Sequence, residues 1–175
     1  MRSAVIILTG SLLVPAAAAS AQNVSDPQIA AIVVTANQVD IDAGQFAAAR
    51  ASSADVKKFA QQMVTDHSGV NRQATELVTR LKVTPEDNAT SQSLKSGGEK
   101  NLASLKALRG AAFDKAYIDH EVVYHEQVLQ ALDKTLIPGA TNAELKSLLV
   151  KVRPAFVAHL EHAKHVQASL GKKTN

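Results

Sequence analysis

The sequence has no cysteine and no tryptophan, and aromatic residues make up only 3% of it. The absence of cysteine excludes disulfides, thiolate metal ligands, cysteine-held iron–sulfur clusters and a cysteine nucleophile. The scarcity of aromatic side chains removes the stacking surfaces on which single-stranded nucleic acids bind. Charge is nearly balanced, with 19 Lys and Arg against 16 Asp and Glu and no concentrated basic patch. We therefore expect no nucleic-acid partner.

Long apolar runs are also missing, except for one between residues 4 and 14. Arg2 precedes this run, and Ala19-Ser20-Ala21 follows it with the small residues of a cleavage site. The run is shorter than the ~20 residues that a membrane-spanning helix needs. It predicts a cleaved secretory signal over residues 1–21 and a single domain over 22–175, with its core at about 26–170. We expect a periplasmic or secreted protein with no transmembrane segment after cleavage, and association with the bacterial envelope remains open.

Sustained alternation of apolar and polar residues, the pattern of a strand, is absent, and apolar residues instead recur at helical spacing. Asp26-Pro27, Ser53 and Asn142 are typical of helix starts, whereas Pro138-Gly139 and Gly171 are typical of helix ends. Gly97-Gly98 weakens the first half of the third segment. The expected helices cover about 26–50, 53–81, 90–108, 111–136 and 142–170.

The lengths of the connections predict how these helices pack. Short connections join the first helix to the second and the fourth to the fifth, so each pair forms an antiparallel hairpin. The shorter third helix lies in the long connection between the two hairpins. The sequence therefore predicts an all-α, antiparallel four-helix bundle with a short additional helix in the middle crossover.

Polar residues interrupt the apolar face of each long helix. Asp40, His67, His125 and His159 each fall within a different apolar stripe, and Glu121 lies one helical turn before His125. All five lie at similar heights in the predicted bundle, so their side chains can meet at its middle. Buried charges and imidazoles must be paired, hydrogen-bonded or bound to a metal, because desolvating them otherwise costs several kcal/mol.

Two interpretations of this polar set stay open. In the first, carboxylates and imidazoles from facing helices bind a transition metal, for which Fe, Mn, Zn and Cu are suitable. In the second, Asp40 pairs with His67, and Glu121 pairs with His125 or His159. Such pairing raises the pKa of a histidine above its ordinary value.

Two neighbours of the set are candidates for a supporting role. Asp66 lies beside His67 at the rim of the apolar stripe, where its carboxylate can orient an imidazole. Tyr124 borders the stripe next to His125, either as a redox-active phenol close to a metal or as a core aromatic with its hydroxyl at the rim.

Several segments resemble a known family, the domain of unknown function 4142 found in exported bacterial proteins. The resemblance rests on Asp55-Val56-Lys57-Lys58-Phe59-Ala60-Gln61-Gln62-Met63-Val64-Thr65-Asp66-His67, Ala112-Phe113-Asp114-Lys115-Ala116-Tyr117, Tyr124-His125 and Ala158-His159-Leu160. It implies a ferritin-like four-helix bundle but no particular activity.

The resemblance also implies which positions the family uses. Its motif histidines correspond to His67, His125 and His159, and its acidic position on the first helix corresponds to Asp40. Glu121 falls where we expect no carboxylate in the family. The Glu-x-x-His motif of ferritin-like di-iron enzymes occurs nowhere in the chain, which argues against a standard di-iron oxidase and favours a mononuclear or histidine-rich site.

Two functions therefore remain. One is a periplasmic metal-binding bundle that acts in metal handling or oxidative stress. The alternative is a non-enzymatic envelope or stress-related protein whose polar network is structural. Hydrolase chemistry is disfavoured because no Gly-x-Ser-x-Gly or similar nucleophile motif appears.

Overall fold

The structure, a computed structural model, describes residues 24–172, and within that range every regular element is helical. The predicted all-α class is confirmed. The predicted signal at residues 1–21 lies outside the described residues. Four long helices are present: α1 (Asp26–Arg50), α2 (Ala54–Leu81), α4 (Gly110–Ala131) and α6 (Ala143–Lys172). The shorter α3 (Ala89–Lys106) follows α2 in the sequence.

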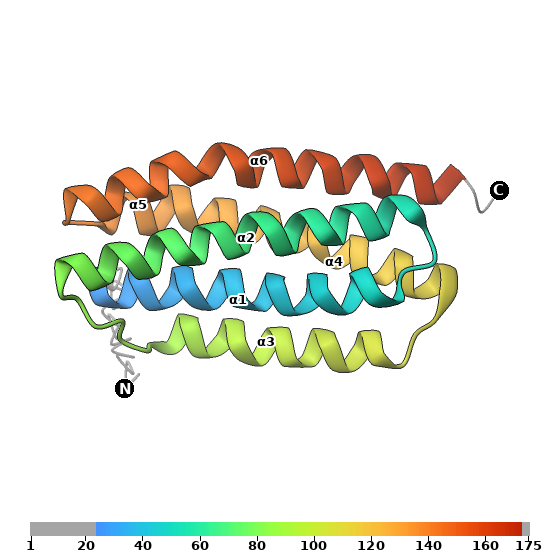
Figure 1. Cartoon of the computed structure of the whole chain (residues 1–175), viewed down its shortest axis with the longest axis horizontal. Helices are drawn as coiled ribbons and strands as arrows, with labels where there is room; N and C mark the ends of the chain where they lie inside the picture. The colour runs from blue at the N-terminus through green and yellow to red at the C-terminus, as the bar shows by residue number, and fades with distance from the viewer. Residues whose placement is uncertain (1–23, 173–175) are drawn as a thin grey trace, which may run out of the picture.

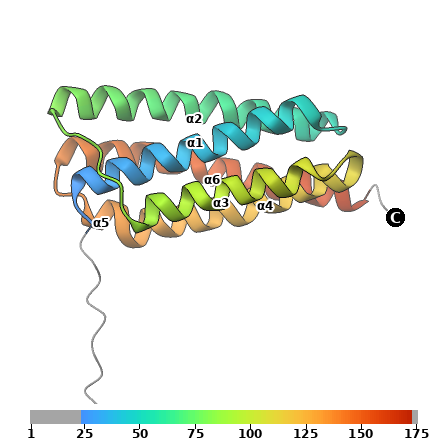
Figure 2. The same cartoon turned by 90° about the horizontal axis from the view of Figure 1, so that it is seen from below.

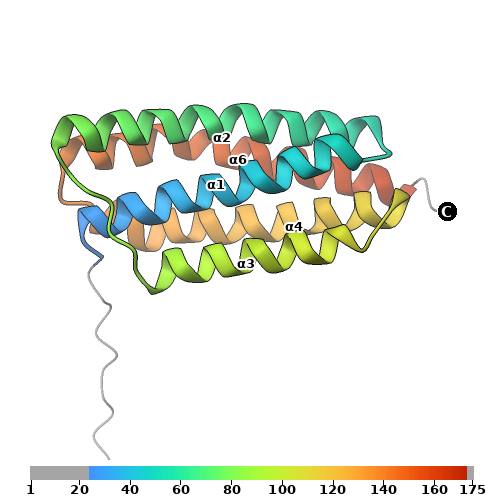
Figure 3. The same cartoon turned by 60° about the horizontal axis from the view of Figure 1, so that its bottom comes forward.

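The helices run along one common axis (Figure 1). α1 and α2 form one antiparallel hairpin, and α4 and α6 form another. α3 lies outside these four, beside α1 and α4 (Figures 2 and 3). α4 continues through a π-helical turn, η1 (Leu132–Leu136), into the short α5 (Ile137–Gly139). The relationship to ferritin-like bundles stays a prediction of the family resemblance.

The start of α1 differs by one residue from the prediction. Ser25, rather than Asp26, occupies the cap position, and its side chain and that of Gln28 bond reciprocally to each other's backbone. The Asp26 carboxylate instead accepts hydrogen bonds from the backbone N–H groups of Thr141 and Asn142. Asp26 thereby fastens the beginning of α1 to the segment that leads into α6.

The start of α2 is capped from a distant helix. Ser53 lies at the predicted cap position, but its hydroxyl makes no capping bond. The carboxylate of Asp114 on α4 accepts from the backbone N–H groups of Ser52 and Ser53 at 3.0 and 2.8 Å. This buried aspartate therefore joins the first hairpin to the second.

The last helix starts as predicted and ends later. The Asn142 side chain accepts from the backbone N–H groups of Glu144 and Leu145, which is the predicted cap. The predicted end at Gly171 is wrong, because α6 includes Gly171 and continues to Lys172. A glycine lowers helix propensity by only about 1 kcal/mol, which does not by itself stop a long packed helix.

α3 is more regular than the sequence indicates. The helix is continuous through Gly97-Gly98, although this pair weakens the predicted first half. Gly98 is buried, and a Cβ atom there would lie 2.8 Å from a methyl carbon of Val39 on α1. The missing side chain therefore lets α3 approach α1 closely, which offsets its low helix propensity.

The core has two apolar clusters, one toward each end of the bundle. One cluster contains Phe59, Phe113 and Tyr117. The other contains Ile29, Leu149 and Phe156. On each long helix a buried polar residue separates the positions that belong to the two clusters. Among the described residues no helix is both long and apolar enough to cross a membrane.

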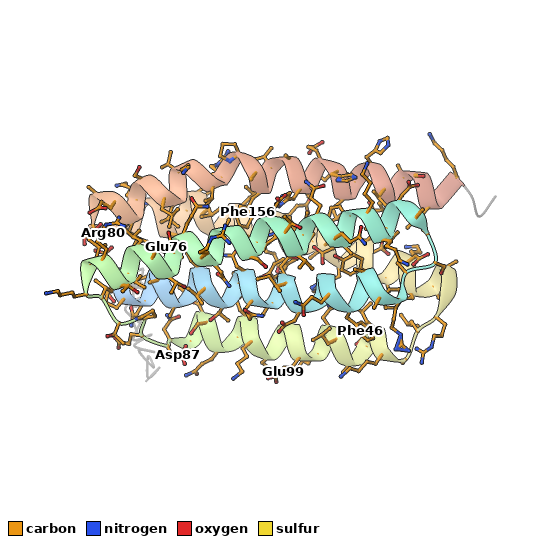
Figure 4. The ribbon with its side chains drawn as sticks, in the orientation of Figure 1. Phe46, Glu76, Arg80, Asp87, Glu99 and Phe156 are labelled. Carbon is orange, nitrogen blue, oxygen red and sulfur yellow. The ribbon has the colours of Figure 1, made fainter. Side chains whose placement is uncertain are left out.

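Charged side chains lie on the outside of the bundle. Figure 4 shows Asp87 and Glu99 pointing away from the helices, near and on α3, and both residues are exposed. Phe156, labelled in the same view, lies near the middle of α6 and is buried. The buried polar residues between the two clusters are therefore an exception, because charged side chains usually lie at the surface.

Candidate metal centre

All five polar residues predicted at mid-bundle lie in one buried layer. α1 contributes Asp40, α2 contributes His67, α4 contributes Glu121 and His125, and α6 contributes His159. None of these residues is more than 2% exposed. The layer lies between the two apolar clusters, so water cannot solvate these groups and their partners within the protein decide their state.

His67 is held by an amide from α1. Its Nδ1 lies 2.7 Å from Oδ1 of Asn37. The Asn37 side-chain nitrogen donates to the Val33 carbonyl at 2.8 Å, which leaves Oδ1 to accept from the imidazole. His67 Nδ1 is therefore the donor, and its Nε2 faces the interior without a hydrogen-bond partner.

His125 is held by the backbone of its own helix. Its Nδ1 lies 3.0 Å from the carbonyl oxygen of Glu121, one turn earlier on α4. A carbonyl oxygen can only accept, so Nδ1 carries the proton of the neutral imidazole. The Nε2 of His125 is buried and has no hydrogen-bond partner.

His159 is held by the carboxylate predicted to orient an imidazole. Its Nε2 lies 2.9 Å from Oδ2 of Asp66 on α2. The same carboxylate oxygen accepts from the side-chain amide of Gln62 at 3.3 Å, and the Gln62 amide oxygen lies 3.0 Å from Nδ1 of His162. The remaining ring nitrogen of His159, Nδ1, is buried without a hydrogen-bond partner.

The three imidazoles thus share one pattern. In each, one ring nitrogen is bonded to an oxygen that accepts its proton, and the other nitrogen is buried and makes no hydrogen bond, although Asp40 lies close to that nitrogen in His67 and His125. One ligand atom from each of His67, His125 and His159 lies within 4.8 Å of the other two. Histidines that bind metals usually donate their second ring N–H to such an acceptor, which fixes the tautomer and turns the lone pair toward the ion.

Asp40 lies against two of these imidazoles. Its Oδ2 is 2.9 Å from Nε2 of His67 and 3.5 Å from Nε2 of His125. The 2.9 Å contact does not have the angles of a hydrogen bond, and both Asp40 oxygens lack a hydrogen-bond partner. A ring lone pair and a carboxylate oxygen at this distance repel each other unless a proton or a metal ion lies between them.

Burial alone would raise the pKa of Asp40, but the neighbouring His67, His125 and His159 together lower it below its ordinary value. These neighbours therefore favour the ionised form of the Asp40 carboxyl group, a negative charge at the centre of the bundle.

Glu121 has the opposite behaviour. Burial, reinforced by the Asp40 charge, raises the pKa of Glu121 well above its ordinary value. Its Oε2 is buried without a hydrogen-bond partner and lies 3.5 Å from Nδ1 of His125. Asp40, Glu121 and His125 form a second group whose ligand atoms lie within 4.8 Å of one another. The carboxyl group of Glu121 can release a proton when a cation lies close to it.

The structure brings together the predicted pairs Asp40–His67 and Glu121–His125, but the pKa values of two of the three rings do not rise as the paired interpretation expects. Burial lowers the pKa of His125 to about 4, and burial also lowers the pKa of His159 despite the adjacent Asp66. The expectation that pairing raises these pKa values is wrong, because desolvation of the imidazolium outweighs the attraction of the carboxylates. His159 also pairs with Asp66 rather than with Glu121.

Tyr124 borders the layer without pointing into it. Its hydroxyl donates to the carbonyl of Ala36 at 2.8 Å, and its ring packs edge-on against His125 with centroids 6.0 Å apart. The Phe156 ring lies 5.0 Å from that of His67 and 6.1 Å from that of His125. These aromatic rings fix the positions of the imidazoles from the apolar side.

Sequence reasoning missed Asn37, which is 2% exposed and holds His67. Asn37 precedes Asp40 by three residues on the same face of α1, so a second polar interruption of that apolar stripe was the available signal. From the sequence, Tyr117 is named only as the last residue of a family motif. Its buried hydroxyl is unpartnered by geometry, although it is close enough to Glu121 to influence the pKa of that residue.

The fold and the site define an all-helical protein with a buried cluster of histidine, aspartate and glutamate that can hold a metal. The chain belongs to the family described as Domain of unknown function (DUF4142), whose model matches residues 12–166. Comparison with curated proteins and with solved structures finds no match.

Proposed function

We propose that this protein binds a divalent first-row transition metal at mid-bundle and acts in metal handling or oxidative stress in the bacterial envelope. His67, His125 and His159 supply imidazole nitrogens, and Asp40 supplies a carboxylate. Glu121 is a further carboxylate beside His125. The predicted secretory signal at residues 1–21 and the family resemblance support a location in the periplasm or outside the cell.

The observation that carries this proposal is a cluster of three buried imidazoles, each of which has one ring nitrogen without a hydrogen-bond partner and brings one ring nitrogen within 4.8 Å of the other two residues. A proton between Asp40 and His67 would satisfy only that pair and would leave Nε2 of His125 and Nδ1 of His159 without partners. A metal ion satisfies all three lone pairs and the Asp40 charge at once. One bound cation would therefore provide a partner for more of the buried polar atoms than one shared proton would.

The separations are near those that such an ion needs. In a tetrahedral site with ligands at about 2.1 Å, neighbouring ligands lie about 3.4 Å apart. The ligand atoms of the histidine cluster lie within 4.8 Å of one another, so they must approach by at most about 1.4 Å. Binding therefore requires the imidazoles to move closer together.

The donor set limits the metal. Three imidazoles disfavour Mg²⁺ and Ca²⁺, which prefer oxygen ligands throughout. The absence of cysteine removes the thiolates that favour Cu(I). Nitrogen-rich coordination with one or two carboxylates suits divalent Fe, Mn, Zn or Cu.

Calorimetric titration of chelator-treated protein tests the proposal. Wild-type protein is expected to bind one equivalent of at least one of Fe(II), Mn(II), Zn(II) and Cu(II) more tightly than about 1 μM, a free energy of about −8 kcal/mol. His67→Ala and His159→Ala are expected to abolish this binding. His165→Ala, which changes an exposed histidine on the same helix as His159, is the matched control and should bind like the wild type.

Two results would contradict the proposal. One is the absence of any binding tighter than micromolar across the four metals, which would leave the polar layer as a structural network in a non-enzymatic envelope protein. The other is equal loss of binding in His165→Ala and His159→Ala, which would place the metal on the surface. Elemental analysis of protein purified from its own host then identifies the ion carried in the cell.

A further inference from the structure

A cavity of about 200 Å³ lies beside the polar layer, on the side of the second apolar cluster. Its buried lining includes Asn37, Tyr124 and Phe156. Each of these residues contacts an imidazole of the layer, as described above for His67 and His125. The cavity therefore ends within one side chain of the candidate metal centre.

The cavity has exposed lining residues on α3 and α4. Thr90 on α3 and Gln127 on α4 are both exposed and both line it. These two helices lie side by side on the outer face of the bundle (Figures 2 and 3). The side of the cavity that faces α3 and α4 is therefore the side closest to solvent.

The deep walls offer no free hydrogen-bonding group. The Asn37 amide bonds to His67 and to the Val33 carbonyl, and the Tyr124 hydroxyl donates to the Ala36 carbonyl. The remaining deep lining is aliphatic or aromatic, including Leu132, Leu136, Leu149 and Val152. Such a cavity disfavours ordered water, which needs two to four polar partners.

The backbone departs from regular α-helix at this wall. The π-helical turn η1 carries both Leu132 and Leu136, which line the cavity. A π turn inserts an extra residue into a helix, and such turns occur frequently at functional sites. The residues that line an empty apolar cavity lose packing contacts, which lowers the stability of the folded protein. A bound ligand can restore these contacts and offset the loss of stability.

We infer that this cavity binds a small, uncharged, apolar molecule of about the size of a single aromatic ring. An apolar cavity of about 150 Å³ can accommodate benzene, so the volume here is sufficient. The bound molecule lies against Phe156 and Tyr124, next to the rings of His67 and His125. Binding to the cavity does not require a metal, so this inference stands or falls separately from the proposed metal site.

Titration of metal-free protein with toluene, followed by NMR of labelled Ile, Leu and Val methyl groups, tests the inference. We expect saturable shifts with 1:1 stoichiometry and contacts from the toluene protons to methyl groups of Leu132, Leu136 and Leu149. Methyl groups of the other apolar cluster, such as those of Val56 and Val166, are the internal control and should not shift.

A cavity-filling variant sharpens this test. Ala131 lines the cavity, so Ala131→Phe places a ring inside it and is expected to weaken toluene binding at least tenfold. Ala103→Phe makes the same change on the exposed face of α3 and should leave binding unchanged. If Ala131→Phe does not fold, Ala131→Leu replaces it and should still weaken binding severalfold.

The inference is overturned if toluene causes no saturable shift in the wild-type protein, or if shifts are spread equally over both apolar clusters. It is also overturned if the folded Ala131 variant binds toluene as tightly as the wild type. Because the protein is kept free of metal throughout, failure of the metal proposal does not affect any of these results.

Discussion

At the scale of single residues, the polar layer depends on which ring nitrogen of each histidine carries a proton. Asn37, the Glu121 carbonyl and Asp66 each accept from one histidine. These acceptors leave lone pairs on Nε2 of His67, Nε2 of His125 and Nδ1 of His159. The acceptors, as much as the histidines, therefore define the candidate metal centre.

Asp66 provides the simplest test of this role. Its side chain is 40% exposed, so its removal disturbs little of the buried core. Asp66→Ala removes the acceptor that holds His159, and metal affinity is expected to fall about 10–100-fold. Asp66→Asn keeps an oxygen acceptor and should retain most of the affinity. Calorimetric titration distinguishes the two variants, and an equal loss in both, or no loss in either, would show that the hydrogen bond to His159 does not matter.

Glu121 gives a pH-dependent prediction for the metal-free protein. Because burial raises its pKa in the folded state, the folded protein keeps a proton that the unfolded chain loses above about pH 4.5. The contribution of Glu121 to stability is therefore fully present below that pH and is lost as pH rises toward the raised folded pKa. The change should be visible between roughly pH 5 and pH 8.

Glu121→Gln removes this titration. Urea unfolding with a chelator present should show that the stability of the variant, relative to the wild type, increases as pH rises above about 5. Parallel stability curves over that range would mean that Glu121 ionises normally in the folded protein. The same variant should bind metal more weakly, since it removes a carboxylate beside His125.

At the scale of helices, apolar periodicity and cap residues predict α1, α2, α3, α4 and α6 to within a few residues, but not the π-helical turn η1 or the short α5. The starts and ends of α1 and α2, the cap at Asn142 and the polar interruptions at Asp40, His67, His125 and His159 follow from spacing within one helix. Features that depend on a second helix could not be predicted. The capping of α2 by Asp114 and the contact of Gly98 with Val39 require knowledge of which helices are neighbours.

The glycine pair in α3 tests this distinction between local and tertiary effects. Gly98→Ala would place a Cβ atom 2.8 Å from a Val39 methyl carbon, so it is expected to destabilise the protein by about 1–3 kcal/mol. Gly97→Ala has no atom within 4 Å of the new Cβ and should stabilise the exposed helix by about 0.5–1 kcal/mol. Denaturant unfolding measures both changes, and effects of the same sign would contradict close packing at Gly98.

At the scale of the whole molecule, the polar layer lies where all four long helices meet. The sequence predicted which residues occupy this layer, because each interrupts the stripe of a different helix at a similar height. It could not predict how the pKa values of His125 and His159 respond, because that depends on the depth of burial and on Asp66 from another helix. It also gave no sign of the cavity beneath Phe156, which is formed by residues from α1, α2, α3, α4, η1 and α6.

A metal ion held by α1, α2, α4 and α6 would connect both hairpins, so its binding energy adds to the stability of the entire bundle. At a free metal concentration about 1,000 times Kd, the expected gain is about 4 kcal/mol, which raises Tm by roughly 10 °C. Thermal unfolding with and without metal measures the shift. His159→Ala should show a much smaller one, and a metal-induced decrease in Tm of the wild type would indicate binding to the unfolded chain instead.

The most direct measurement of the central claim is anomalous X-ray diffraction from a crystal of the protein soaked with the metal that binds most tightly. We expect one anomalous peak about 2.0–2.2 Å from Nε2 of His67, Nε2 of His125 and Nδ1 of His159, with an Asp40 oxygen also in the coordination shell. A soaked crystal with no peak in the polar layer, or with a peak only at surface histidines such as His165, would contradict the account.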